Sequence, residues 1–296
     1  MSTVLLKINS SKLYLIIAVI LLVIGAVAFY YSINLFLANL NQTNTSTSIR
    51  VSQWSGYMVA SDIQNRSPVV SSVSASWTVP EIQLSENSTF SGVWVGIGGY
   101  GEKNLIQAGT EQESRNGRVY YYAWYELLPD YLVRIPSLHV QPSDTISASI
   151  SLIDENANTW SIEISDVTRD QHFEKVVVYT SSRLSAEWIV ERPNVNGSIS
   201  TLANFGNVTF TECEATIDGV TGAIGNFSYA QLVMVGTEDN PLVSVSSLDE
   251  DDSSFTVSYL EPSTSQDNLQ VNSFTVLPIA FFTLAFTRKP YSSVSS

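Results

Sequence analysis

The sequence contains a single cysteine, Cys213, in 296 residues. One thiol cannot form an internal disulfide, so the folded state must be stabilised by core packing alone. No local signature of a catalytic thiol surrounds Cys213. We therefore expect it to be an ordinary, half-buried cysteine within a strand.

Histidine is almost as scarce, because only His139 and His172 occur. A zinc peptidase of the His-Glu-x-x-His type lacks its ligands, and neither histidine lies in a setting that suits a serine triad. We expect both histidines at the surface. The sequence predicts no metal site and no cofactor.

Charged residues make up only 14% of the chain, against about 25% in ordinary globular proteins. The net charge of −14 argues against a nucleic acid as partner, because phosphates are bound by lysine and arginine. Serine, threonine and asparagine supply the polarity instead. A surface with few ion pairs loses little stability when carboxylates become protonated, which suits acidic surroundings.

One long apolar run extends from Leu13 to Leu37. It is long enough to cross a hydrocarbon core of about 30 Å as a helix. Lys7 and Lys12 precede it, and no basic residue follows before Arg50, so the positive-inside rule places residues 1–12 in the cytoplasm. We expect a single-pass anchor in the cell membrane with the remaining chain outside. A cleaved signal peptide, and hence a secreted protein, is the alternative.

The rest of the chain alternates with period two, as half-buried strands do. Isoleucine, alanine and leucine alternate with serine over 146–152, and turn signals such as Arg115-Asn116-Gly117 separate such runs. The pattern predicts an all-β, antiparallel sandwich or barrel. We expect a polar linker over 38–49, one domain over 50–261, and a C-terminal extension over 262–296 with an apolar, strand-like segment.

Three polar side chains lie inside apolar, strand-like runs. A carboxamide or carboxylate buried in this way costs free energy unless it is paired or used, so three in one domain indicate a site. The runs are Leu105-Ile106-Gln107-Ala108-Gly109, Tyr122-Ala123-Trp124-Tyr125-Glu126 and Ser185-Ala186-Glu187-Trp188-Ile189-Val190-Glu191.

Strand alternation predicts which of these side chains share a face. Gln107 should lie on the face opposite Ile106 and Ala108, and Glu187 on the face opposite Trp188. Glu191 stands beside an arginine, and we expect it to be a solvated strand end.

Glu126 should share a face with Trp124, two residues away. A carboxyl beside an indole is desolvated, which raises its pKa.

The three motifs resemble the glutamic peptidase (eqolisin) family, acid-acting endopeptidases built around a glutamine and a glutamate. The resemblance extends over nearly the whole predicted domain, from Trp54 through Ala75-Ser76-Trp77-Thr78-Val79-Pro80 and on to 203–211 and 255–260. The chain departs from the family at Gly98 and Tyr122, where an acid is usual, so the acidic network around the site is thinner.

This resemblance implies a lectin-like (concanavalin A-like) β-sandwich with a substrate cleft in one concave face. By position, Gln107 matches the catalytic glutamine and Glu187 the catalytic glutamate. Glu187 would take a proton from water and return it to the leaving amine, while Gln107 would stabilise the oxyanion. The substrate would be a protein or peptide. The residues predicted to line or support the cleft are Trp94, Trp124, Glu126, Glu111 and Trp54.

Two other functions stay open at this point. A glycosidase with paired carboxylates could use Glu111, Glu113 and Glu126 beside Trp94 and Trp124. An anchored carbohydrate-binding module is the non-enzymatic alternative, although it has no need of the Gln107 and Glu187 pair.

Overall fold

The computed structural model describes residues 22, 24, 25, 27, 29–31 and 47–261. The seven N-terminal residues among them are helical. No helix within the described residues has the length and hydrophobicity needed to span a membrane. Most of the predicted anchor and linker, and the whole predicted extension over 262–296, lie outside the described residues, so these expectations stay predictions.

Residues 47–261 form an all-β structure with two short 3-10 helices, η1 (Ile224–Asn226) and η2 (Thr237–Asp239). The strands are β1 (Thr47–Val51), β2 (Trp54–Ala60), β3 (Val70–Thr78), β4 (Thr89–Gly98), β5 (Leu105–Arg115), β6 (Arg118–Leu127), β7 (Val133–Arg134), β8 (Thr145–Asp154), β9 (Thr159–Asp166), β10 (Gln171–Val178), β11 (Ala186–Glu191), β12 (Asn194–Val195), β13 (Ser198–Ile199), β14 (Thr201–Leu202), β15 (Asn207–Ile217), β16 (Val220–Ala223), β17 (Ser228–Met234), β18 (Val243–Val245) and β19 (Phe255–Tyr259).

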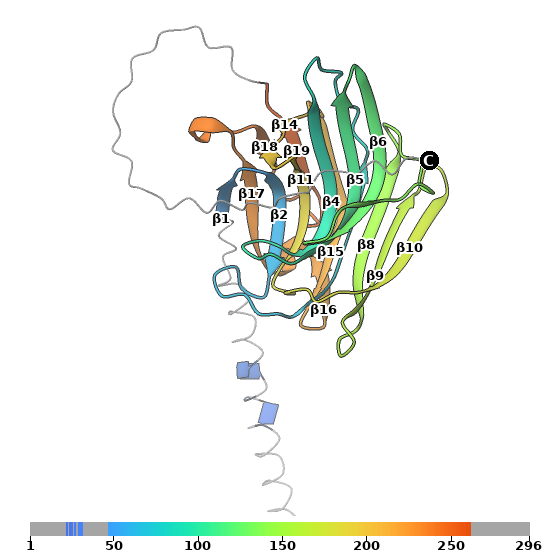
Figure 1. Cartoon of the computed structure of the whole chain (residues 1–296). Coiled ribbons are helices and arrows are strands. Elements are labelled where there is room, and N and C mark those ends of the chain that lie inside the picture. The colour runs from blue at the N-terminus through green and yellow to red at the C-terminus, as the bar shows by residue number, and fades with distance from the viewer. Residues whose placement is uncertain (1–21, 23, 26, 28, 32–46, 262–296) are drawn as a thin grey trace, which may run out of the picture. The chain divides into compact units, whose positions relative to one another are not determined.

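Two large sheets make up this domain (Figure 1). Sheet A has the order β1-β17-β2-β11-β4-β5-β6-β7, with β14 also paired to β4. Sheet B has the order β10-β9-β8-β3-β15-β19-β18, with β16 also paired to β15. Most neighbours are antiparallel, so the predicted antiparallel sandwich is confirmed. The finer expectation of a lectin-like sandwich stays a prediction.

The domain begins slightly earlier than the sequence predicts. β1 starts at Thr47, inside the stretch assigned to the linker, and pairs in parallel with β17 at the edge of sheet A. The polar composition of this segment hides a strand because an edge strand has only one neighbour and needs few apolar side chains.

Alternating side chains build the core between the sheets. Ile146, Ala148 and Ile150 are buried in it, whereas the serines between them lie on the other side of β8. Trp188 also enters this core and donates its indole N–H to the Ser74 carbonyl at 2.8 Å. Cys213 is fully buried rather than half-buried. These contacts supply the packing that a chain without disulfides requires.

A second buried apolar cluster lies on the opposite side of sheet A, facing away from sheet B. We call this side the outer face of sheet A. Its apolar members are Trp54, Met58, Trp94, Leu105, Trp124, Leu128, Ile189, Ala230 and Leu232. An outer sheet face that is buried in this way is a specialised surface, because solvent-facing strand positions are ordinarily polar and exposed.

Candidate active site

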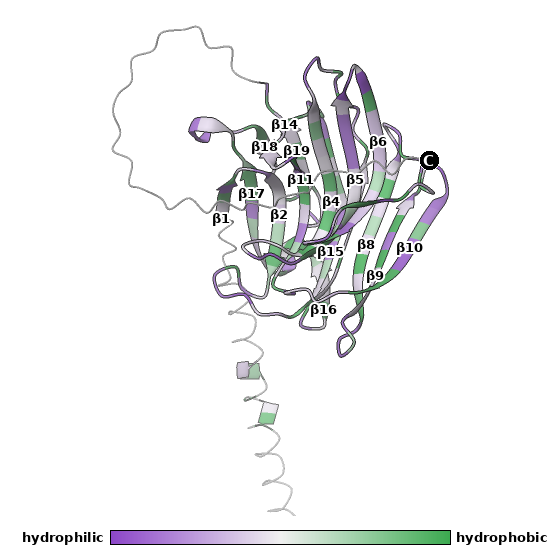
Figure 2. Ribbon diagram, in the orientation of Figure 1, coloured by the Kyte–Doolittle hydropathy of each residue, from purple (hydrophilic) through white to green (hydrophobic). Residues whose placement is uncertain are grey.

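Strand β5 is the most unusual strand of sheet A. Figure 2 shows much of it in purple, and yet ten of its eleven residues are buried. It carries Gln107, Glu111 and Glu113 on the outer face. Buried polar side chains need partners or a function, so these residues of β5 are candidates for a functional site.

Gln107 and Glu187 lie in one row across sheet A. Gly96 on β4 is the cross-strand partner of Glu187 on β11 and of Gln107 on β5. The row continues on β6, where Glu126 pairs with Gln107. Neighbouring strands are about 4.8 Å apart, so the backbones at Gln107 and Glu187 are separated by about 10 Å. The missing side chain at Gly96 leaves the gap that two extended side chains can share.

Apolar groups close around this gap. A Cβ added at Gly96 would lie 2.9 Å from Leu105 Cδ1 and 2.9 Å from Trp94 Cζ3. Gln107 is only 2% exposed, and Glu187 is 0% exposed. Both polar side chains are therefore shielded from solvent in this structure.

Gln107 is oriented by Glu126. The amide Nε2 of Gln107 donates to Glu126 Oε2 at 2.7 Å, and both side chains are buried. Gln107 Oε1 has no hydrogen-bond partner in the described part of the chain. One amide hydrogen is thus used to hold the group in place, while the second hydrogen and the carbonyl oxygen stay available.

Glu187 has an unusual environment for a carboxyl group. Burial raises its pKa well above the ordinary value of 4.5. The Ser185 hydroxyl and the Arg66 guanidinium favour the ionised form, but burial outweighs both. Neither Glu187 oxygen meets hydrogen-bond geometry with any group among residues 47–261. A buried carboxyl whose pKa is shifted in this way is a candidate functional group.

The prediction that Glu191 is a solvated strand end is wrong. Glu191 is buried, and Trp94 donates its indole N–H to Glu191 Oε2 at 2.8 Å. Trp94 also packs edge-on against Trp54, with ring centroids 5.0 Å apart. The spacing of four residues from Glu187 carries the missed signal, because it places both glutamates on the same face of β11.

A pair of acids, Glu111 and Glu191, lies further along the same strands. Gly92 on β4 is the partner of both Glu191 and Glu111, as Gly96 is of Glu187 and Gln107. A Cβ at Gly92 would lie 3.2 Å from Glu111 Oε2. The same arrangement therefore occurs twice on the outer face of sheet A. At each place, a glycine of β4 makes room for polar side chains from the strands on either side.

Glu113 is the next acidic residue along this face of β5, and its partners are basic. It accepts a hydrogen bond from the Tyr122 hydroxyl at 2.6 Å and forms ion pairs with Arg115 at 2.7 Å and Arg134 at 3.5 Å. The Arg134 guanidinium stands 3.6 Å from the centre of the Tyr122 ring. Tyr122, one of the two departures from the family pattern, thus takes part in an ion-pair network.

All seven residues predicted for the site come from strands of sheet A and lie on its outer face. They are Gln107, Glu187, Trp94, Trp124, Glu126, Glu111 and Trp54. Their roles in binding or catalysis stay predictions. The two histidines are exposed, as expected.

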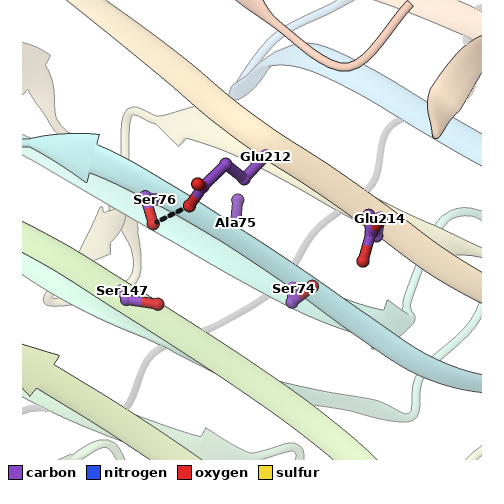
Figure 3. Close-up of a pocket in the computed structure, with 6 residues that line it drawn as sticks. All are labelled: Ser74, Ala75, Ser76, Ser147, Glu212 and Glu214. Carbon is purple, nitrogen blue, oxygen red and sulfur yellow. Dashed lines mark hydrogen bonds between the residues drawn. The ribbon is translucent and has the colours of Figure 1, made fainter.

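A hollow of about 300 Å³ lies elsewhere, on the side of sheet B that faces away from sheet A (Figure 3). Ser76 donates a hydrogen bond at 3.1 Å to Glu212, which lies at a bulge of β15. Serines, one alanine and two glutamates line this hollow, and none of them belongs to the predicted site. The described residues contain no group of three or more histidine, cysteine, aspartate or glutamate side chains that could hold a metal ion.

Comparison with known proteins agrees with this arrangement. Residues 52–259 match the model of the Peptidase A4 family. The match covers well over half of the chain, and the chain therefore belongs to the peptidase A4, or eqolisin, family of glutamic peptidases.

The individual relatives share about a quarter to a third of their aligned residues with this chain. The chain is 32% identical over 133 residues to aspergillopepsin-2 of Aspergillus niger, and the match spans 43% of this chain and 46% of that protein, about half its length. Aspergilloglutamic peptidase of Aspergillus niger superposes with a TM-score of 0.51 at 28% identity, over 58% of this chain and 99% of that one. Scytalido-glutamic peptidase, solved with a transition-state analogue inhibitor, gives a TM-score of 0.59 at 24% identity over 71% of this chain and 98% of that one.

Proposed function

We propose that this chain is an endopeptidase in which Gln107 and Glu187 act on one water molecule between them. The observation that carries this proposal is their common partner: both side chains flank Gly96 on the outer face of sheet A. Family membership supports hydrolysis of peptide bonds. SCP-B, a member of the eqolisin family, was solved in a complex with the tripeptide Ala-Ile-His, which supports a peptide as the substrate of this chain.

The reaction needs an activated water, an oxyanion stabiliser and a proton for the leaving amine. The Glu187 carboxylate takes a proton from water, and the resulting hydroxide attacks the scissile carbonyl carbon. The second N–H of Gln107 donates to the oxyanion, while the first stays on Glu126. The C–N bond then breaks, and Glu187 returns its proton to the amine nitrogen. No charge or proton is left over at the end of this cycle.

Glu126 acts in this proposal as a positioning residue. It fixes the Gln107 amide through a buried hydrogen bond of 2.7 Å, so the oxyanion stabiliser is oriented before the substrate arrives. Preorganised donors of this kind cost no reorganisation during the reaction, and one is typically worth about 3–4 kcal/mol.

The proposed working range is acidic. It is supported by the low content of charged residues, since protonation of carboxylates then removes few ion pairs. The raised pKa of Glu187 limits this range from below, because the carboxylate that activates water is depleted in strong acid.

The test is proteolysis of casein from pH 2 to pH 8 by the full chain and by Glu187→Gln, Glu187→Ala and Gln107→Ala, with a soluble polysaccharide as second substrate. We expect the Glu187 variants to be inactive and Gln107→Ala to lose about 100- to 1000-fold in kcat. Retention of most of the activity by any variant with an intact fold would reject the assignment.

The carbohydrate alternatives find less support on the outer face of sheet A. Trp94 and Trp124 are fully buried, so neither presents a ring face for a sugar to stack on. Glu113 is already bound by Arg115 and Arg134. Release of reducing sugar from the polysaccharide would support the glycosidase alternative.

We further propose that the domain is exported. The apolar run over 13–37 and the basic residues before it support an anchor in the cell membrane with the domain outside. Mass spectrometry of the mature N-terminus distinguishes a retained anchor from a cleaved signal peptide.

A further inference from the structure

Two loops border the row that contains Glu187. The first, over 61–69, joins β2 to β3, and its Ile63 packs against the apolar cluster that includes Met58. Met58 is the cross-strand neighbour of Glu187. The second loop, over 99–104, joins β4 to β5, and its Tyr100 packs against the same cluster. Both loops therefore lie at the Glu187 side of the outer face of sheet A.

Arg66 connects these two loops. Its Nη1 donates to the Tyr100 carbonyl at 2.6 Å, and its guanidinium carbon stands 5.4 Å from the centre of the Tyr100 ring. A Cβ added at Gly101, where φ is +73°, would lie 3.4 Å from Arg66 Nη2. A carbonyl, a ring and a turn thus hold the guanidinium in one orientation, which lowers the entropy cost of binding a further group.

The charge of Arg66 is not compensated by an ion pair within the described structure. Arg115 and Arg134 on the same sheet both pair with Glu113, whereas Arg66 forms no ion pair with any residue among 47–261. Arg66 is half-buried, so it keeps a route to solvent. Its field reaches Glu187, whose pKa it lowers. A cation that is oriented, half-buried and unpaired matches what a bidentate carboxylate site requires.

We propose that Arg66 binds a carboxylate of the peptide substrate close to the scissile bond. The carboxylate belongs either to an aspartate or glutamate side chain or to the C-terminus of a short peptide, since a guanidinium recognises both by the same fork of N–H donors. This inference rests on the proposed function, because it places the subsite beside Glu187. The preference is for a negatively charged substrate group. Without Arg66, the glutamates on the outer face of sheet A would disfavour such a group.

The experiment uses one peptide frame with glutamate, glutamine or lysine at each position flanking the scissile bond. A second arm compares a free C-terminus with a C-terminal amide. Assays run at pH 5.5, where glutamate side chains are largely ionised because their ordinary pKa is about 4.3. The enzymes are the full chain, Arg66→Gln, Arg66→Lys and Arg118→Gln, the last of which removes an exposed arginine at the start of β6.

We expect the full chain to prefer a carboxylate over its neutral counterpart at one position by about tenfold or more in kcat/KM, as charge-assisted hydrogen bonds allow. Arg66→Gln should reduce this ratio to about one. Arg66→Lys should keep part of it, and Arg118→Gln should keep all of it. The arm that shows the preference tells which carboxylate is bound. Equal rates for charged and neutral peptides, or a preference that survives in Arg66→Gln, would overturn the inference while leaving the peptidase assignment intact.

Peptide binding to Glu187→Gln supplies a readout that does not depend on turnover. Fluorescence titration should show tighter binding of the carboxylate peptide than of its neutral counterpart, and the double variant Arg66→Gln/Glu187→Gln should lose the difference. Absence of any cleavage by the full chain, combined with this binding pattern, would reject the proposed function and keep the Arg66 site. Equal binding of both peptides would reject the Arg66 site.

Discussion

Gln107 and Glu187 face each other across a glycine. Gly96 pairs with both residues, so the carboxamide and the carboxyl come from strands β5 and β11 on either side of β4. Leu105 and Trp94 border the space above Gly96. The geometry makes Gly96 as necessary to the proposed chemistry as the two polar residues.

Replacement of Gly96 by alanine should therefore remove activity without removing the polar groups. The new methyl group would lie 2.9 Å from both Leu105 and Trp94, which we expect to cost about 1–3 kcal/mol of stability. Displacement of the shared water should reduce kcat/KM by about 100-fold or more. Peptide cleavage and urea unfolding measure the two effects separately.

Gly92→Ala is the matched control on the same strand and face. Its methyl group would meet only the Glu111 carboxyl at 3.2 Å, with the next contacts at 3.7 and 3.9 Å. We expect this variant to keep most of its activity. Equal losses in both variants would show that β4 is merely intolerant of larger side chains.

Glu191 should act on the site through Trp94. Glu191→Ala leaves the buried indole N–H of Trp94 without its acceptor, which we expect to cost about 1–3 kcal/mol and to lower kcat. Glu191→Gln retains an acceptor oxygen and should restore most of both. Tryptophan fluorescence and denaturant unfolding report the change around Trp94, and an unchanged kcat in Glu191→Ala would contradict the positioning role.

The stability of the protein should depend on pH through Glu187. The folded state binds the Glu187 proton more tightly than the unfolded state, because burial raises the pKa above 4.5. The contribution of this proton is fully present below that ordinary value and is lost as the pH rises through the folded-state pKa. Glu187→Gln carries no such proton, so its melting temperature should exceed that of the full chain at pH 7 and approach it below pH 4.

The same shift should set the acid limb of proteolysis. Only the Glu187 carboxylate activates water, so kcat/KM should rise with pH along this limb with a midpoint above 4.5. Arg66→Gln removes a charge that lowers the Glu187 pKa, and it should move the midpoint to higher pH. A midpoint at or below 4.5 in a full pH profile would show that substrate binding, or another group, controls the ionisation.

The antiparallel sandwich and the faces of the site strands could be predicted because they depend on local periodicity. Gln107 and Trp188 follow strict alternation within their strands, and the structure places both on the predicted faces. The burial of Glu191 could not be predicted in this way. Its burial depends on the indole of Trp94, which comes from another strand 97 positions away.

The sequence by itself determined the alternating core strands, the faces of Gln107 and Glu187 and the family, because side-chain alternation and motif order are local properties of the chain. Only the tertiary structure decided that Gly96 separates Gln107 from Glu187, that Glu126 orients Gln107, and that Arg66 stands beside the row. These relationships arise from strand order and register. Both are set by long-range packing of the whole sandwich, which no local pattern specifies.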